Sequence, residues 1–263
     1  MTVHFIGAGP GAADLLTVRA VRLLASSPVC VYAGTYLDVE VLSHCPPDAT
    51  LIDSAGLSLD EITAHLVAAH AADQDVARLC SGDPSLYSAL AEQARRLDRA
   101  GVPWDVTPGV PAYAAAAAIL GRELTVPELA QTVILTRTQA ASTAMPESES
   151  LERLAATGAT LVLHLAIRRT RELAGRLAGF YGPECSVAVV SRATRPDELV
   201  LRGTLADIGD QVEAAGLRQA AVIIVGPALA AEGFVDSHLY GTRIARRRSV
   251  DGVVPDLGDE GIR

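Results

Sequence analysis

The sequence contains no lysine, and all 22 of its Lys and Arg residues are arginines. This excludes a phosphate-binding loop of the lysine type, a Schiff-base lysine and the lysine bases of several dehydrogenase classes. The chain also has no C-x-x-C pair and no histidine pair at metal-ligand spacing, so we expect no metal site. No apolar run reaches the ~18 uninterrupted residues of a membrane span, and no targeting segment precedes the first apolar run. A membrane is therefore not an expected partner.

The composition is that of a compact globular protein. Of the 263 residues, 49% are hydrophobic and 20% are charged, which is enough for one large domain or two ordinary ones. The net charge of −9 argues against a surface that binds nucleic acid. Cys30 and Cys80 fall in or beside apolar runs, so we expect buried, reduced thiols and a cytoplasmic protein.

The first part of the chain, residues 1–121, alternates short apolar runs with helical patterns. This alternation predicts an α/β domain with a parallel, doubly wound sheet that helices cover on both faces. The expected strands are residues 3–6, 29–32, 51–53, 76–80 and 102–106. The expected helices are residues 14–25, 39–43, 59–72, 85–100 and 113–120.

The second part, residues 122–241, predicts a C-terminal α/β domain with a mixed sheet. The expected strands are residues 132–136, 160–165, 186–191, 198–203 and 220–225, of which 198–203 is expected to be antiparallel. The expected helices are residues 151–157, 169–181 and 205–215. Residues 242–263 are rich in Arg, Asp, Gly and Pro and predict a polar, flexible tail.

A glycine-rich turn, GAGPG at residues 7–11, connects the first expected strand to a helix. Such turns bring ligands against the backbone at the carboxyl edge of a sheet. The turn differs from a dinucleotide fingerprint in two ways. Pro10 removes a backbone N–H where a pyrophosphate would need donors, and residues 28–34 contain no carboxylate for a ribose hydroxyl. A dehydrogenase that binds NAD(P) and a tight turn without a ligand are the alternatives.

Two further loops follow strands in the same way, SGDPSLYS at residues 81–88 and TPGVPA at residues 107–112. Asp83 followed by Pro84 could instead be the N-cap of a helix. The alanine run at residues 114–118 has little side-chain bulk, as a closely pressed ligand would require. A helix-packing seam explains the alanines equally well.

The segments GAGPGAADLLT, SGDPSLYS and TPGVPAYAAAAAILG occur in this order, followed by LVLHL at residues 161–165 and AVIIVG at residues 221–226. Together they closely resemble the tetrapyrrole methylases that use S-adenosylmethionine, from residue 3 to about residue 240. The resemblance implies two α/β domains with the cofactor folded between them. It also implies methyl transfer to a macrocycle that carries acetate and propionate arms.

Within that family, Tyr32-Ala33-Gly34 resembles a segment of the members that methylate precorrin-4 at C11 in cobalamin biosynthesis. Thr136-Arg137 and the later Met-Pro-Glu at residues 145–147 resemble a second segment of the same members, T-R…G-R-T-P-M-P-E. Residues 141–144 differ from the G-R-T-P of that segment. Members that methylate uroporphyrinogen III carry aspartate where this chain has Ala33. Precorrin-4 that already contains cobalt, another ring position and diphthine synthesis remain alternative substrates or reactions.

The resemblance implies a cofactor site with apolar walls and a few backbone hydrogen bonds. The residues expected there are Gly9, Pro10, Gly11, Ser81, Gly82, Asp83, Leu86, Pro111, Ala112, Leu165, Ala193 and Ala221. Leu165 stands where the family often has methionine, which is a conservative exchange. Asp83 is expected to meet the ammonium or hydroxyl groups of the cofactor.

Carboxylate arms on the macrocycle call for arginines at the cleft between the domains. Arg137, Arg168 and Arg192 each follow an expected strand of the second domain, at the edge that would face the cofactor. The expected substrate-binding residues are Arg137, Tyr32, Gly34, Arg168 and Arg192. All six histidines are assigned surface or packing roles, and the sequence nominates no catalytic base. We also expect a homodimer, and a non-catalytic nucleotide-binding module is the alternative outside the enzymes.

Overall fold

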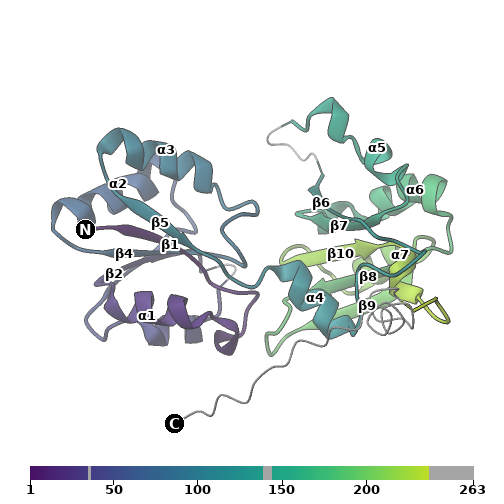
Figure 1. Cartoon of the computed structure of the whole chain (residues 1–263), viewed down its shortest axis with the longest axis horizontal. Helices are drawn as coiled ribbons and strands as arrows, with labels where there is room; N and C mark the ends of the chain where they lie inside the picture. The colour runs from purple at the N-terminus through teal and green to yellow at the C-terminus, as the bar shows by residue number, and fades with distance from the viewer. Residues whose placement is uncertain (35–36, 139–143, 237–263) are drawn as a thin grey trace, which may run out of the picture.

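The structure, a computed structural model, describes residues 1–34, 37–138 and 144–236. It contains two five-stranded sheets, each covered by helices, which lie next to each other along the long axis of the molecule (Figure 1). Strands β1–β5 form the first sheet and β6–β10 the second. The expectation of two α/β units is confirmed. The tail at residues 242–263 lies outside the described residues.

The first sheet is parallel throughout, with the strand order β3-β2-β4-β1-β5. Its strands are β1 (Val3–Gly7), β2 (Val29–Tyr32), β3 (Thr50–Asp53), β4 (Val76–Cys80) and β5 (Trp104–Thr107). The predicted parallel, doubly wound sheet is therefore confirmed. Because all five strands run the same way, the turns that follow them gather at one edge.

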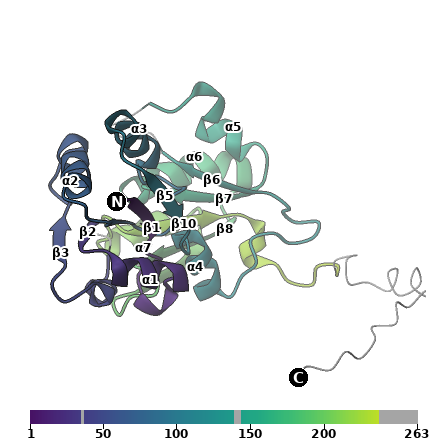
Figure 2. The ribbon, with the colours of Figure 1, turned by 60° about the vertical axis from the view of Figure 1, so that its left-hand side comes forward.

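Helices cover both faces of this sheet. Phe5 of β1 packs with residues of α2 and α3, whereas Ile6 packs with residues of α1 on the other face. Both views show α1 across the sheet from α2 and α3 (Figure 1 and Figure 2). The helical segments are η1 (Ala13–Leu15), α1 (Val18–Ser26), η2 (Val39–His44), α2 (Leu59–Ala71) and α3 (Leu90–Ala100).

Two helices begin later than the sequence predicted. Helix α3 starts at Leu90 rather than at residue 85, because Tyr87 and Ala89 have left-handed φ values of 54° and 55°, which a helix cannot accommodate. Helix α1 starts at Val18 rather than at residue 14, because Thr17 is its N-cap and accepts a hydrogen bond from the Ala20 N–H. The segment before Thr17 forms a single 3-10 turn instead.

The second sheet is mixed, with the order β6-β7-β10-β8-β9. Strands β6 and β7 are parallel, and the other neighbouring pairs are antiparallel, including the predicted pairing of β9. Strands β6, β7 and β8 therefore end at the same edge. The strands are β6 (Val133–Arg137), β7 (Thr160–His164), β8 (Ser186–Ser191), β9 (Leu199–Thr204) and β10 (Ala221–Val225).

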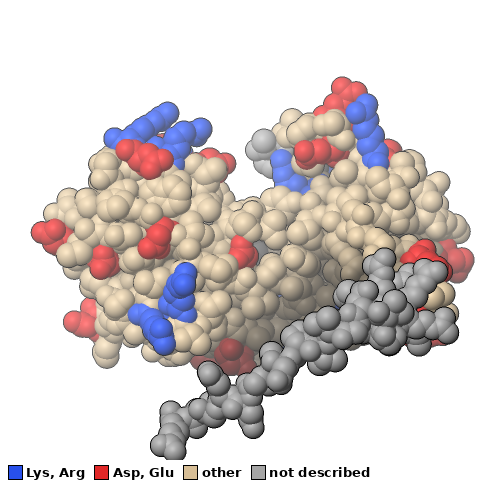
Figure 3. All heavy atoms as spheres, in the orientation of Figure 1, with Lys and Arg blue, Asp and Glu red and all other residues tan. Residues whose placement is uncertain are grey.

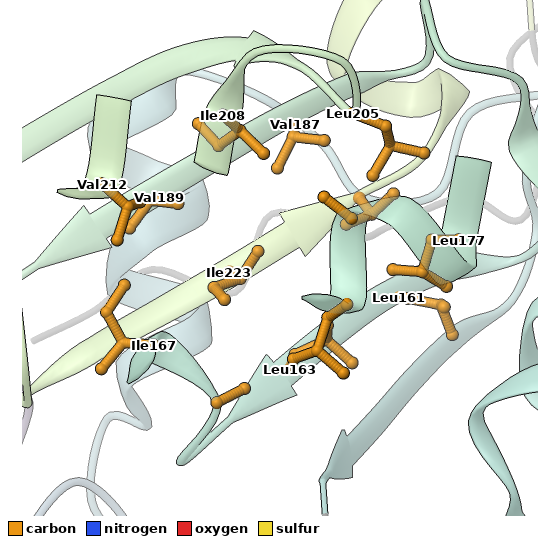
Figure 4. Packing of buried hydrophobic residues seen from close by; sticks show 14 of the residues in the cluster. Leu161, Leu163, Ile167, Leu177, Val187, Val189, Leu205, Ile208, Val212 and Ile223 are labelled. Atoms are coloured by element: carbon orange, nitrogen blue, oxygen red, sulfur yellow. The ribbon is translucent and has the colours of Figure 1, made fainter. Parts of the chain in front are cut away.

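The core of this half lies between one face of the sheet and the helices α5 (Leu151–Ala155), α6 (Thr170–Tyr181) and α7 (Ile208–Ala214). Figure 4 shows Leu161 and Leu163 of β7 beside Leu177 of α6. Short 3-10 segments complete the connections, namely η3 (Glu147–Glu149), η4 (Ile167–Arg169) and η5 (Pro227–Ala230).

Helix α4 (Ala112–Leu120) covers the opposite face of the second sheet. Ala115 and Ala116 are buried there against Val162 and Val190. The alanine run is therefore a packing seam over most of its length. Helix α4 follows the last strand of the first sheet in sequence but packs on the second, so it joins the two halves (Figure 1).

All four cysteines are free thiols, and Cys30 and Cys80 are buried as predicted. In the part of the chain that the structure describes, no group of three His, Cys, Asp or Glu side chains could hold a metal ion. No helix among the same residues has the length and apolar character needed to cross a bilayer.

Candidate functional site

A cavity of about 400 Å³ lies between the carboxyl edge of the first sheet and the edge of the second sheet at which β7 and β8 end. Its walls include residues from the turns after β1 and β4 and the start of α4 on one side, and from the ends of β7 and β8 and the start of β10 on the other. Six of the residues predicted for the cofactor line it, namely Pro10, Ser81, Ala112, Leu165, Ala193 and Ala221. These residues lie far apart in the sequence, and the fold brings the motifs that contain them together around one cavity.

The three glycine-containing loops of the first sheet pack backbone against backbone. A Cβ atom on Gly109 would lie 2.8 Å from the Cα of Gly7 and still closer to the carbonyl oxygen of Gly82. Gly9 and Gly82 form an isolated bridge, and Gly82 has a φ of 66°. Glycine is required here because the loops approach too closely for side chains. The glycines shape the wall of the cavity but do not themselves line it.

Two backbone donors of the first loop are already bonded within the protein. The Gly9 N–H donates to the Gly82 carbonyl (3.1 Å), and the Ala12 N–H donates to the Thr194 hydroxyl (3.0 Å). Pro10, between them, has no N–H. A dinucleotide pyrophosphate would have to displace these bonds, which disfavours the NAD(P) alternative.

Asp83 connects two of the loops. Its Oδ2 accepts a hydrogen bond from the Gly109 N–H (2.8 Å), and its Oδ1 accepts from the N–H and the hydroxyl of Ser85. Partial burial acts to raise the pKa of Asp83, but these hydrogen bonds outweigh it and lower the pKa below its ordinary value. No helix begins at residues 84–88, so the N-cap interpretation is wrong. In this structure the carboxylate bonds to loop backbone and does not line the cavity.

The loop after β8 connects the two halves on the far side of the cavity. A Cβ atom on Gly11 would lie 2.7 Å from the Ala193 carbonyl oxygen and 2.6 Å from Cγ of Arg195. Thr194, which accepts from Ala12, has a left-handed φ of 67°. Gly11 is therefore needed for close contact between the first loop and the second half of the chain.

The residue after β7 has the most exposed large apolar side chain of the cavity wall. Leu165 is 64% exposed and has a φ of 55°. The preceding residue, His164, lies against Tyr87 from the loop after β4, with ring centroids 5.4 Å apart. Burial lowers the pKa of His164 below its ordinary value, so the imidazole is neutral at pH 7. Sequence reasoning assigned His164 a packing or surface role and did not single out Tyr87.

Arginines are the charged residues in the cavity wall. The described lining contains Arg168, Arg169, Arg192, Arg195 and Arg218, and it contains no carboxylate. Some of these side chains are already paired, as Arg192 is with Asp197 and Arg169 is with Glu172. The molecule is notched between the two sheets, and arginine side chains lie beside the notch on the side of the second sheet (Figure 3). The local charge therefore favours an anion although the whole chain is acidic.

Arg137 lies at the end of β6 and lines a neighbouring hollow rather than the cavity. Arg169, Arg176 and Thr138 line the same hollow, and Arg169 borders both spaces. The strand-end argument therefore places Arg168 and Arg192 in the wall of the cavity and Arg137 beside it. Residues 139–143, where the sequence resemblance was weakest, lie outside the described residues.

The other predicted site residues lie near the cavity without lining it. Gly9, Gly11, Gly82, Asp83, Leu86 and Pro111 belong to the loops that shape its wall. Tyr32 ends β2, and the Gly34 N–H donates to Oδ1 of Asp53 (3.0 Å) at the same edge of the sheet. The signal that could have identified His164 is its place at the carboxyl end of a buried strand, and Tyr87 carries no comparable signal.

A family model described as tetrapyrrole (corrin/porphyrin) methylases matches residues 2–209. The chain is 62% identical over 240 residues to the precorrin-4 C(11)-methyltransferase of Rhodococcus erythropolis, which covers 91% of this chain and 96% of that protein.

Two crystal structures share the fold. A cobalt precorrin-4 methyltransferase has a TM-score of 0.83 and 36% identity, covering 87% of this chain and 95% of the other. Uroporphyrin-III C-methyltransferase from Thermus thermophilus, complexed with S-adenyl homocysteine, has a TM-score of 0.74 and 29% identity, covering 88% and 99%. The residues that the family model matches include the whole first sheet and strands β6 to β9 of the second. The chain therefore belongs to the tetrapyrrole (corrin/porphyrin) methylases.

Proposed function

We propose that this protein is an S-adenosylmethionine-dependent methyltransferase that converts precorrin-4 to precorrin-5 by methylating C11, a step of cobalamin biosynthesis. The observation that carries the proposal is the 62% identity, over nearly the whole of both chains, to a precorrin-4 C(11)-methyltransferase. Fold alone would not be sufficient, because one fold serves several ring positions in related enzymes.

The cavity suits the proposed cofactor in size and in chemistry. Its volume of about 400 Å³ lies within the usual range of small-molecule sites. Ala112, Leu165 and Ala221 would supply apolar wall for an adenosine, and Ser81 would supply a polar contact. When bound, the cofactor supplies an already activated methyl group.

The residues of the chain then have to hold, orient and shield the reactants. Positioning alone can contribute about 7–11 kcal/mol to lowering a barrier of this type. The exposed Leu165 would separate the two ligands, and Arg168, Arg192 and Arg137 would bind carboxylate arms of the macrocycle. Tyr32 and Gly34, at the same edge of the first sheet, would border the macrocycle from the other side.

Cobalt-precorrin-4 is the second candidate substrate, because a cobalt precorrin-4 methyltransferase shares this fold at a TM-score of 0.83. The higher identity to the enzyme named for metal-free precorrin-4 favours the metal-free ring. Uroporphyrinogen III is less favoured, since Ala33 replaces the aspartate typical of those enzymes.

The test is incubation of the protein with methyl-labelled S-adenosylmethionine and precorrin-4, with and without cobalt in the ring, followed by NMR of the product. Label at C11 of the metal-free ring is the expected result. Label at another carbon, or transfer only to the cobalt-containing ring, would contradict the assignment of the substrate.

We also propose that the protein acts as a homodimer in the cytoplasm. Its four free cysteines suit a reducing compartment. Sedimentation equilibrium of the purified chain is expected to give twice the monomer mass of 27.4 kDa.

A further inference from the structure

The cavity wall contains a single group suited to accept a proton near neutral pH. Among the described residues that line it, His164 is the one side chain with a basic site of this kind. The other polar side chains there are arginines, Ser81 and Gln219, none of which is a base at neutral pH. Asp83 and Tyr87, which lie close by, are poor candidates because the pKa of Asp83 is lowered and burial raises the pKa of Tyr87.

The two nitrogens of His164 lie in different surroundings. Nε2 is buried and has no hydrogen-bond partner among the described residues. Nδ1 is not fully buried, and no described residue forms a hydrogen bond with it either. Nδ1 is therefore the accessible nitrogen of a ring that forms part of the cavity wall. An imidazole held without polar partners is unusual, because such groups are normally satisfied.

The surroundings keep this imidazole neutral. Tyr87 lies against the His164 ring, and Arg137 is paired with His164 across β6 and β7. The charged residues of the cavity lining are the arginines that follow β7 and β8 and the one that precedes β10. Glu149 is a nearby carboxylate, whose charge raises the pKa of Tyr87. Burial lowers the pKa of His164 and so keeps the imidazole neutral at pH 7.

Methylation of a tetrapyrrole carbon leaves a positive charge on the macrocycle, and a base removes this charge by accepting a proton. An electron pair of the ring forms the new bond from C11 to the methyl carbon, while the carbon–sulfur bond breaks and its pair stays on sulfur as a neutral thioether. The macrocycle is left with one positive charge. It becomes neutral when a ring N–H bond returns its electron pair to the π system and the proton leaves. We propose that Nδ1 of His164 accepts this proton, so that His164 is the catalytic base of the methyl transfer, an inference that rests on the proposed function.

The test compares wild-type protein with His164→Gln, using His65→Gln as a matched control on the exposed face of α2. Methyl transfer to precorrin-4 is followed in single turnovers at saturating ligand concentrations. His164→Gln is expected to slow the reaction by about 10²–10⁴-fold, the usual contribution of general acid–base catalysis. S-adenosylhomocysteine affinity, measured by calorimetry, is expected to stay within twofold of wild type and thereby to show that the variant is folded.

The pH profile provides a second readout. The wild-type rate is expected to fall as the pH drops through a midpoint below 6.5, the ordinary histidine value, because only neutral His164 can accept a proton. His164→Gln should lose this acid limb, and His65→Gln should retain it. NMR titration of the His164 ring in the wild-type complex with S-adenosylhomocysteine should likewise give a midpoint below the ordinary histidine value, without relying on any variant.

Three outcomes would overturn the proposal. In the first, His164→Gln turns over at the wild-type rate with an unchanged acid limb. In the second, cofactor affinity collapses while the saturated rate survives, which would make His164 a cofactor-binding residue. In the third, the wild-type rate does not fall as the pH drops. Failure of the proposed function is distinguishable, because wild-type protein would then label no C11 carbon at all.

Discussion

Gly109 lies so close to two other loops that even a methyl group has no room beside it. A Cβ atom there would come within 2.8 Å of the Gly7 Cα, in a region made of backbone that cannot rotate away. The loops can therefore pack together at this edge only because these glycines have no side chains. Asp83 then joins the loops by accepting the Gly109 N–H.

Gly109→Ala is expected to destabilise the protein by about 1–3 kcal/mol, the usual cost of overpacking. The matched control is Gly175→Ala in α6, where an added Cβ meets nothing within 4 Å. That change should be neutral or stabilise by up to about 1 kcal/mol, because alanine is the better helix former. Urea unfolding of both variants measures the difference, and equal stabilities would show that the loops can move apart.

Arg137 carries the prediction about the substrate. Arg137→Ala is expected to weaken macrocycle binding by ~1.5–3 kcal/mol, the scale of a charge-assisted hydrogen bond. S-adenosylhomocysteine affinity should hardly change, since Arg137 lines the neighbouring hollow and not the cavity. Calorimetry with each ligand separates the two effects, with Arg96→Ala on α3 as the control. Loss of cofactor binding with intact macrocycle affinity would refute this role.

At the scale of elements, buried strands were predicted well because their apolar runs leave little choice. Strand β4 was predicted at residues 76–80 and is found at Val76–Cys80. Helix starts were harder, because left-handed residues such as Tyr87 and Ala89 carry no signal in their side chains. Helix α4 shows a different limit. Its alanines indicate a close neighbour without saying which sheet that neighbour belongs to.

Ala116→Leu in α4 should destabilise the protein by about 1–3 kcal/mol, because Ala116 is fully buried against the second sheet. Ala118→Leu, on the exposed side of the same helix, should change stability by less than about 0.5 kcal/mol. Thermal unfolding of the pair measures the contrast. A stable Ala116→Leu protein would mean that α4 is not held tightly on the sheet.

At the scale of the whole molecule, the acidic chain gathers arginines around a cavity between its two sheets. Ligands that bind there should stabilise both halves, since loops from both form the wall. The net charge of −9 would repel a polyanion at long range, so attraction has to come from the local arginines.

S-adenosylhomocysteine is therefore expected to raise the melting temperature, with a stabilisation of about 2.7 kcal/mol at a hundred times its Kd. NAD(P) should leave the melting temperature unchanged, because donors of the first loop are bonded within the protein and Pro10 has none. Scanning fluorimetry with each ligand tests the contrast. A shift with NAD(P) and none with S-adenosylhomocysteine would reverse the assignment of the cofactor.

The sequence by itself determined the family, the two α/β units and the loops that carry the site, because glycine-rich turns and buried strand runs are local features. Only the tertiary structure decided that Pro10 and Leu165 share one cavity, that Asp83 bonds to loop backbone and that Arg137 lies beside Arg169 in a separate hollow. It also decided that His164 lies against Tyr87 and that its Nε2 has no hydrogen-bond partner among the described residues. Such contacts join residues far apart in the chain, and their geometry depends on how the two sheets pack rather than on any local pattern.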